Sequence, residues 1–183
     1  MQLTDEGAPD LGDAGRLAVV PGTELQDGTI EVDLAGDTLP NASSEARGFV
    51  GIAFRVSNDS ARFECFYLRP KNGRAEDQLR RNHSTQYISM PGYPWDKLRA
   101  EDPGKYESYV DLVPGQWTHV KIQVSGTSAR LYVNGATEPT LIVNDLKQAP
   151  ASGRIAYWIG PGTVAHFANL KIRHEKAVGD AAH

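Results

Sequence analysis

Short runs in which apolar and polar residues alternate are the feature that most constrains this fold. Between residues 117 and 135, Val120, Ile122 and Val124 alternate with polar residues, and Leu131 resumes the pattern after a turn. Successive side chains of a β-strand point to opposite faces, so this pattern is typical of strands with one buried and one solvated face. The stretch therefore predicts neighbouring antiparallel strands.

The dipeptide Asn134-Gly135 follows directly. Both residue types tolerate a positive φ, which tight hairpin turns require. We therefore predict a tight turn at this point.

Comparable runs recur along the whole chain, separated by glycine and proline. The predicted strands cover residues 17–20, 28–36, 48–56, 63–69, 85–89, 107–112, 117–126, 129–135, 139–146, 153–160 and 165–174. Long helical periodicity is absent, and only two helical turns are predicted, near 76–81 and 96–101. The rhythm predicts one all-β domain over residues 1–183, an antiparallel two-sheet β-sandwich with its core at about 17–173.

Composition excludes several classes of protein. Hydrophobic residues make up 40% of the 183, which argues against disorder, and the net charge of -4 gives no electrostatic basis for binding nucleic acid. No apolar run reaches the roughly 18 residues of a membrane helix. Cys65 is the single cysteine, so no internal disulfide can form. The N-terminus lacks a signal peptide, which leaves open a cytoplasmic protein or an exported one whose leader has been removed.

The order of the strand sequences resembles a known superfamily. The pieces that carry the likeness are GTIEVDLAG, GFVGIAFRV, FYLRPKNG, QWTHVKIQVSGTSARLYVNG, LIVNDLK, GRIAYWIG and AHFANLKI. They resemble laminin-G-like and concanavalin A-like lectins and glucanases, and are most similar to the bacterial 3-keto-disaccharide hydrolase domains. The resemblance implies a jelly-roll sandwich whose concave face handles sugars, but a fold does not determine a function.

Three functions follow from the resemblance. The first is a carbohydrate-binding domain that recognises a glycan on its concave face. The second is a glycoside hydrolase acting on (3-keto-)disaccharides or related glycans, and the third is a protein-interaction domain of laminin-G type. The acid triplet E-x-D-x-x-E of the glucanases is absent, which favours binding. A legume-lectin calcium cluster has no counterpart, so we predict no cofactor and leave open only a structural calcium ion. The oligomeric state stays open.

Alternation also predicts a binding face. Arg55 should share one face with Gly51 and Ala53, whose small side chains leave room for a ligand, and Tyr67 and Arg69 should lie beside them. Forked guanidinium donors and a tyrosine suit sugar hydroxyls and carboxylates. The alternative is that the arginines pair with surface carboxylates while the tyrosine packs.

The polar segment 70–106 is a second source of ligand contacts. Its residues Arg80, His83, Gln86, Tyr93 and Trp95 combine hydrogen-bonding groups with aromatic faces that stack on sugar rings. We predict that this segment roofs the site. The alternative is that the aromatic residues anchor a long loop by packing.

The sequence supports candidate catalytic residues less strongly than candidate binding residues. The catalytic candidates are Glu31, Glu64, Glu107 and His83. Glu31 and Asp33 lie on one face of a strand, roughly 6.5–7 Å apart at Cα, which approaches the spacing in glycosidases. We favour the interpretation that this pair belongs to a solvated strand face, and that His83 is simply a polar loop residue.

Overall fold

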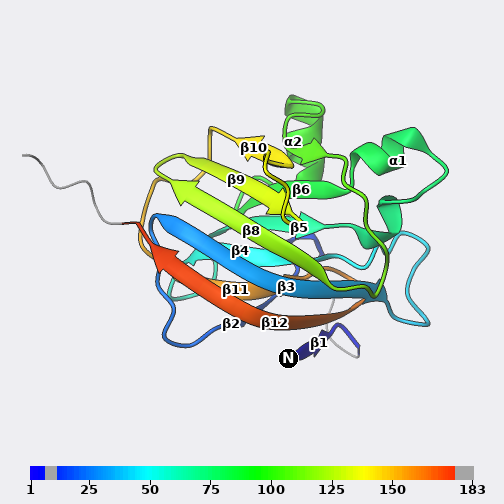
Figure 1. Cartoon of the computed structure of the whole chain (residues 1–183), viewed down its shortest axis with the longest axis horizontal. Coiled ribbons are helices and arrows are strands. Elements are labelled where there is room, and N and C mark those ends of the chain that lie inside the picture. Colours follow the sequence, from blue (N-terminus) through cyan, green and yellow to red (C-terminus); the bar gives the residue numbers. More distant parts are fainter. Residues whose placement is uncertain (7–11, 176–183) are drawn as a thin grey trace, which may run out of the picture.

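Two antiparallel sheets pack face to face in the computed structural model, which describes residues 1–6 and 12–175 (Figure 1). In order across sheet A, the strands are β1 (Gln2–Thr4), β12 (Thr163–His174), β3 (Gly28–Thr38), β8 (Thr118–Ser125), β9 (Ser128–Val133) and β10 (Leu141–Val143). Across sheet B they are β2 (Arg16–Val19), β11 (Arg154–Ile159), β4 (Val50–Val56), β5 (Phe63–Leu68), β6 (Thr85–Met90) and β7 (Glu107–Ser108). The predicted two-sheet sandwich is confirmed.

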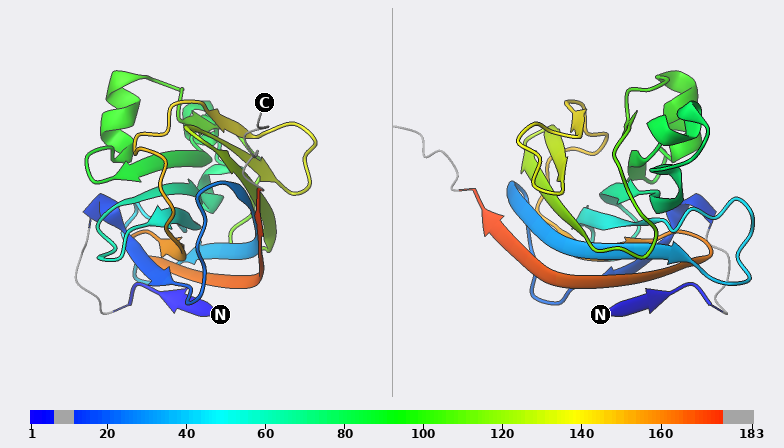
Figure 2. Two further views of the ribbon diagram at one scale, coloured as in Figure 1. Left: turned by 90° about the vertical axis from the view of Figure 1, so that its left-hand side faces the viewer. Right: turned by 45° about the vertical axis from the view of Figure 1, so that its right-hand side comes forward.

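Two short α-helices interrupt the strands. They are α1 (Gln78–Asn82) and α2 (Trp95–Glu101), close to the two predicted helical turns, and two 3-10 turns cover Gly12–Ala14 and Pro70–Asn72. Figure 2 shows both helices and the connection between β3 and β4 on the same side of the sandwich. Among the described residues, no helix has the length and apolar character needed to cross a membrane.

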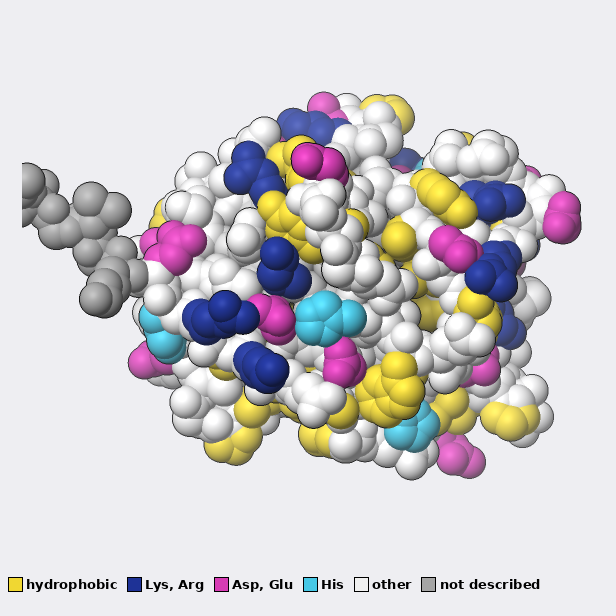
Figure 3. Space-filling model, viewed as in Figure 1, with side chains coloured by type: hydrophobic (Ala, Val, Ile, Leu, Met, Phe, Trp, Pro, Cys, Tyr) yellow, Lys and Arg dark blue, Asp and Glu magenta, His cyan; other side chains and the backbone are white. Residues whose placement is uncertain are grey.

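Sheet A is buried on one face only. Its register pairs Ile30 with Ile122 and Val32 with Val120, and these side chains point into the core. The alternating positions carry polar side chains, and acidic, basic and histidine side chains lie intermingled on the outer face (Figure 3). The alternation in the sequence therefore correctly predicted that these strands have one buried and one solvated face.

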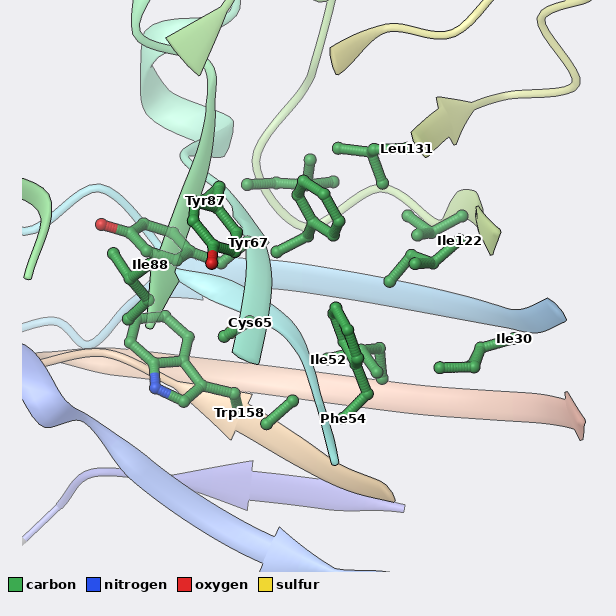
Figure 4. Close-up of a cluster of buried hydrophobic side chains, with 14 of the residues drawn as sticks. Ile30, Ile52, Phe54, Cys65, Tyr67, Tyr87, Ile88, Ile122, Leu131 and Trp158 are labelled. Carbon is green, nitrogen blue, oxygen red and sulfur yellow. The ribbon is translucent and has the colours of Figure 1, made fainter. Parts of the chain in front are cut away.

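Sheet B is buried on both faces. Every residue of β4 and β5 is buried. Figure 4 shows Phe54 and Ile52 facing Ile122 of sheet A, while Trp158 and Ile88 lie on the far side of sheet B. That far side is covered by the chain near residues 12–15 and by α2, so β4 and β5 at its centre have no solvated face.

Some strand boundaries differ from those predicted. The run predicted over 107–112 pairs only at Glu107–Ser108, and the run over 139–146 pairs only at Leu141–Val143. Strand β1 was missed, because three residues are too few to show alternation. The pairing of β1 with β12 is thus a tertiary feature with no local signal.

The predicted turn at Asn134-Gly135 is confirmed. The two residues have φ values of 53° and 72°, and the Ala136 amide donates to the Val133 carbonyl across 3.2 Å. A Cβ added at Gly135 would meet no atom within 4 Å, so only the backbone opposes a substitution there.

We predict that Gly135→Val lowers the free energy of unfolding by about 1 kcal/mol, because a β-branched residue is strained at positive φ. Urea unfolding measures the change. The neighbouring exposed variant Ala136→Val is the control and should unfold like the unsubstituted protein. Equal stability of both variants would show that the turn tolerates valine.

Candidate functional site

A pocket of about 550 Å³ opens at one end of sheet B. It lies where β5 and β11 end and where β4 and β6 begin. Its walls come from residues 43–49 of the β3–β4 connection, from residues 69–83, from α2, from Asp13 and from the turn at 161–162. Because the strands of sheet B run antiparallel, their ends bring these distant segments together.

Arg69 forms the floor of the pocket. It directly follows β5 and is only 5% exposed. Its Nη1 donates to the His83 carbonyl (3.0 Å) and to Glu107 (3.2 Å). Its Nη2 donates to the Tyr67 hydroxyl (3.0 Å) and to the side chain of Gln86 (2.9 Å). Four bonds use the donors of both terminal nitrogens, so Arg69 holds the floor together.

Strand register explains this arrangement. Tyr67 pairs with Gln86, and Gln86 pairs with Glu107, so one cross-strand row places all three side chains on the same face of sheet B. Burial, which outweighs the nearby charge of Arg69, raises the pKa of Tyr67 to about 12. The phenol is therefore neutral and accepts from Arg69.

Glu107 is shared among three basic side chains. Its side chain is 2% exposed and accepts from Arg69 and from Nε of Arg99 (3.0 Å), while Nε2 of His83 lies 3.5 Å away. Burial lowers the pKa of His83 and outweighs the opposing charge of Glu107, while the positive charges of Arg99 and Arg69 act in the same direction as burial. His83 is therefore neutral at pH 7 and offers the pocket a polar ring without a charge.

Trp95 begins α2 and presents a half-buried indole to the pocket. Its Nε1 donates to Asp13 across 2.7 Å. The guanidinium groups of Arg99 and Arg69 lie 4.6 and 5.9 Å from its ring centroid. These contacts fix the orientation of an aromatic surface at the pocket wall.

Asn72 contributes an acceptor without a partner. It lies in the 3-10 turn after β5, lines the pocket and is 4% exposed. Its Nδ2 donates to the His83 carbonyl, while its buried Oδ1 has no hydrogen-bond partner within residues 1–6 and 12–175. An unsatisfied buried acceptor is costly, and a donor from a ligand would satisfy it.

The structure does not bring Arg55 to this pocket. The pairing of β4 with β11 shifts, because three steps along β4 (53 to 56) face two steps along β11 (156 to 154). At this bulge Arg55 adopts a φ of 53°. Its side chain turns to sheet A and donates to the carbonyl of Gln26 (3.0 Å), to Asp27 (3.1 Å) and to the carbonyl of Gly126 (2.7 Å). The prediction that Arg55 shares a concavity with Tyr67 and Arg69 is therefore wrong.

The room expected above Gly51 is also filled. Tyr67 and Trp158 stack there with ring centroids 4.4 Å apart, and both are buried. A Cβ on Gly51 would meet Cβ of Tyr67 at 2.5 Å. The small residue therefore makes room for the protein's own tyrosine, and the pocket opens farther along, beyond Leu68.

The residues of segment 70–106 that were predicted to contact a ligand lie in two different places. Arg80, His83 and Trp95 line the pocket, and Gln86 lies beneath it, bound to Arg69. Tyr93 does not line the pocket; its ring contacts the ammonium groups of Lys97 and Lys147 at 4.5 and 5.5 Å from the centroid.

The carboxylates proposed for catalysis lie in three separate environments. Glu31 and Asp33 flank His119 on the outer face of sheet A. Glu64 is buried and accepts from the Tyr87 hydroxyl (2.5 Å) and the Gln148 amide (2.8 Å), and burial raises its pKa. Glu107 lies beneath the pocket. The three glutamates therefore do not share one cleft as a pair of catalytic acids would, and only Glu107 has the fourth candidate, His83, beside it at 3.5 Å.

Arg47, Asn72 and Arg99 are among the pocket residues that the sequence analysis missed. They lie in a connection, a turn and a short helix, and only the packing of these segments against sheet B brings them together. Within residues 1–6 and 12–175, no group of three or more His, Cys, Asp or Glu residues is placed to hold a metal ion.

Comparison with solved structures identifies proteins that have a similar fold. No protein-family model matches the chain, and no curated protein matches it. Among solved structures, carbohydrate-binding module CBM66 of Bacillus subtilis is similar with a TM-score of 0.57, at 12% identity over 92% of each chain. A candidate glycosyl hydrolase of Parabacteroides distasonis has a TM-score of 0.55, at 13% identity over 87% of this chain and 90% of the other.

Congerin II bound to lactose and MES is similar with a TM-score of 0.51, at 13% identity over 86% of this chain and all of its own. The chain therefore shares the fold of these proteins, a two-sheet jelly-roll sandwich, which is the fold that the resemblance implied.

We predict that Arg69→Ala lowers the free energy of unfolding by about 3 kcal/mol, because it removes a partner from the buried Glu107. The control is Arg74→Ala, which breaks the exposed pair with Asp111 and should cost less than about 1 kcal/mol. Urea unfolding of both variants measures the difference. Equal costs would contradict the role of Arg69 as the floor of the pocket.

Proposed function

We propose that the chain is a carbohydrate-binding domain that holds a sugar in the pocket at the end of sheet B. The observation that carries the proposal is that one pocket holds both the Trp95 ring and the Oδ1 of Asn72, an acceptor with no partner among the described residues. A sugar ring has apolar faces that stack on an indole and hydroxyl groups that donate to a buried acceptor.

The size of the pocket agrees with this ligand class. Small-molecule sites commonly measure about 300–1,000 Å³, and this pocket measures about 550 Å³. The orientation of Trp95 is held by Asp13, Arg69 and Arg99, so little ordering is needed when a ligand binds.

The structural neighbours support the same proposal. Carbohydrate-binding module CBM66 and lactose-bound congerin II share the fold. The glycosyl hydrolase neighbour supports the alternative of cleavage more weakly, because the carboxylates of Asp13 and Glu107 are already engaged. Asp13 accepts from Trp95 and Glu107 is shared among basic groups, while the third acid, Glu45, is 86% exposed and lies 3.5 Å from Arg47. We therefore rank binding ahead of hydrolysis and of a laminin-G-like protein contact.

A glycan array followed by calorimetry tests the proposal. For the best-bound glycan, Trp95→Ala should weaken affinity at least about tenfold, since truncating a central aromatic contact commonly costs more than the 1.4 kcal/mol that corresponds to tenfold. The control is Trp117→Ala, which removes a tryptophan that is 57% exposed outside the pocket and should leave affinity unchanged.

The outcomes separate the alternatives. Binding that survives Trp95→Ala, or is lost in Trp117→Ala, would place the site elsewhere. Release of reducing sugar from the bound glycan would support hydrolysis.

A further inference from the structure

We infer that the pocket selects acidic glycans, whose sugar rings carry a carboxylate or a sulfate ester, over neutral ones. This inference rests on the proposed function and names its ligand class. Four arginines, Arg47, Arg69, Arg80 and Arg99, line the pocket of a chain whose net charge is -4. A positive pocket on an acidic chain is a local feature that the overall charge does not explain.

The acidic side chains balance only part of this charge. Glu107 offsets one of the two positive charges of Arg69 and Arg99, both of which it binds. Asp13, which accepts from Trp95, is a second acid in the pocket wall. The outer side of the pocket is formed by Arg47 and Arg80. The acidic partner of Arg47 is Glu45, whose side chain is 86% exposed, and an ion pair with so exposed a group is weak.

The side chain of Arg80 has no partner within the described part of the chain. Arg80 lies on α1, where its backbone amide donates to Asp77, but its exposed side chain makes no hydrogen bond or ion pair with residues 1–6 or 12–175. Its five N–H groups are therefore available for a ligand in the pocket that it lines.

The pKa of Arg47 responds to the positive charges around it. Its side chain is 16% exposed, and its Nη1 is held by the carbonyl groups of Ser44 and Ala46. Burial lowers the pKa of Arg47, and the charges of Arg80 and Arg69 lower it further. Like charges that are held close together and partly desolvated favour an anion between them.

The two halves of the pocket then contact different parts of one ligand. Trp95 and Asn72 contact the sugar ring and its hydroxyl groups, while Arg47 and Arg80 bind the acidic substituent. Guanidinium groups bind carboxylate and sulfate oxygens through paired hydrogen bonds, so both kinds of acidic sugar share the chemistry required.

The test uses an array of neutral, uronate-containing and sulfated glycans. Acidic glycans should give the strongest binding. The best-bound glycan is then compared with the same glycan after reduction of its carboxyl groups or removal of its sulfates, and calorimetry should show at least about a tenfold loss of affinity. If reduction of the carboxyl groups weakens binding, the carboxylate is the group recognised; if removal of the sulfates weakens it, the sulfate is.

The matched variants are Arg80→Gln and Arg130→Gln, each of which removes one exposed positive charge. Arg130 lies on β9 of sheet A, outside the pocket. Arg80→Gln should weaken binding of the acidic glycan about tenfold and leave binding of its neutralised form unchanged, while Arg130→Gln should change neither.

Three results would overturn the inference. Neutral glycans that bind as tightly as acidic ones, or an Arg80→Gln variant with full affinity, would remove acid selectivity while leaving the proposed sugar site intact. Equal losses in both variants would show non-specific charge attraction. If no glycan binds at all, the proposed function itself fails.

Discussion

The buried ion pair between Arg69 and Glu107 is the interaction on which the pocket depends. Arg69 lies past the last residue of β5 and joins three neighbouring strands, through Tyr67 on its own strand, Gln86 on β6 and Glu107 on β7. Glu107 in turn holds Arg99 on α2. A buried pair costs desolvation and is therefore weak evidence for stability by itself. Its effect here is positional, because it fixes the helix that carries the aromatic wall.

The difference between the two sheets determines where a ligand can bind. Sheet A turns a face of mixed charge to solvent (Figure 3), whereas the far face of sheet B is covered by residues 12–15 and α2. The pocket lies where this cover ends, beyond Leu68. Its contacts come from connections and short helices placed on a rigid sheet, a common arrangement for binding sites.

Sequence patterns predicted sheet A better than sheet B, for a physical reason. Alternation reports a solvated face, and β8 and β9 have one. Strand β4 is buried on both sides, and its alternation could not show that the face bearing Gly51 and Ala53 is covered as well; the bulge at Arg55 left no mark in the sequence. The composition of segment 70–106 still indicated Arg80, His83 and Trp95 as ligand contacts, and the structure places these three in the pocket. Asn72 and Arg47 carry no periodic signal, because the packing of separate segments creates their environment.

NMR mapping of backbone amides during titration with the best-bound glycan shows whether the pocket at the end of sheet B holds the sugar. If it does, the perturbed amides cluster in residues 43–49, 69–73, 80–84 and 95–99, around the pocket. Amides of β3, β8 and β12 at the centre of sheet A should keep their positions. Perturbations concentrated on the outer face of sheet A, around His119, would mean that the sugar binds there and not in the pocket.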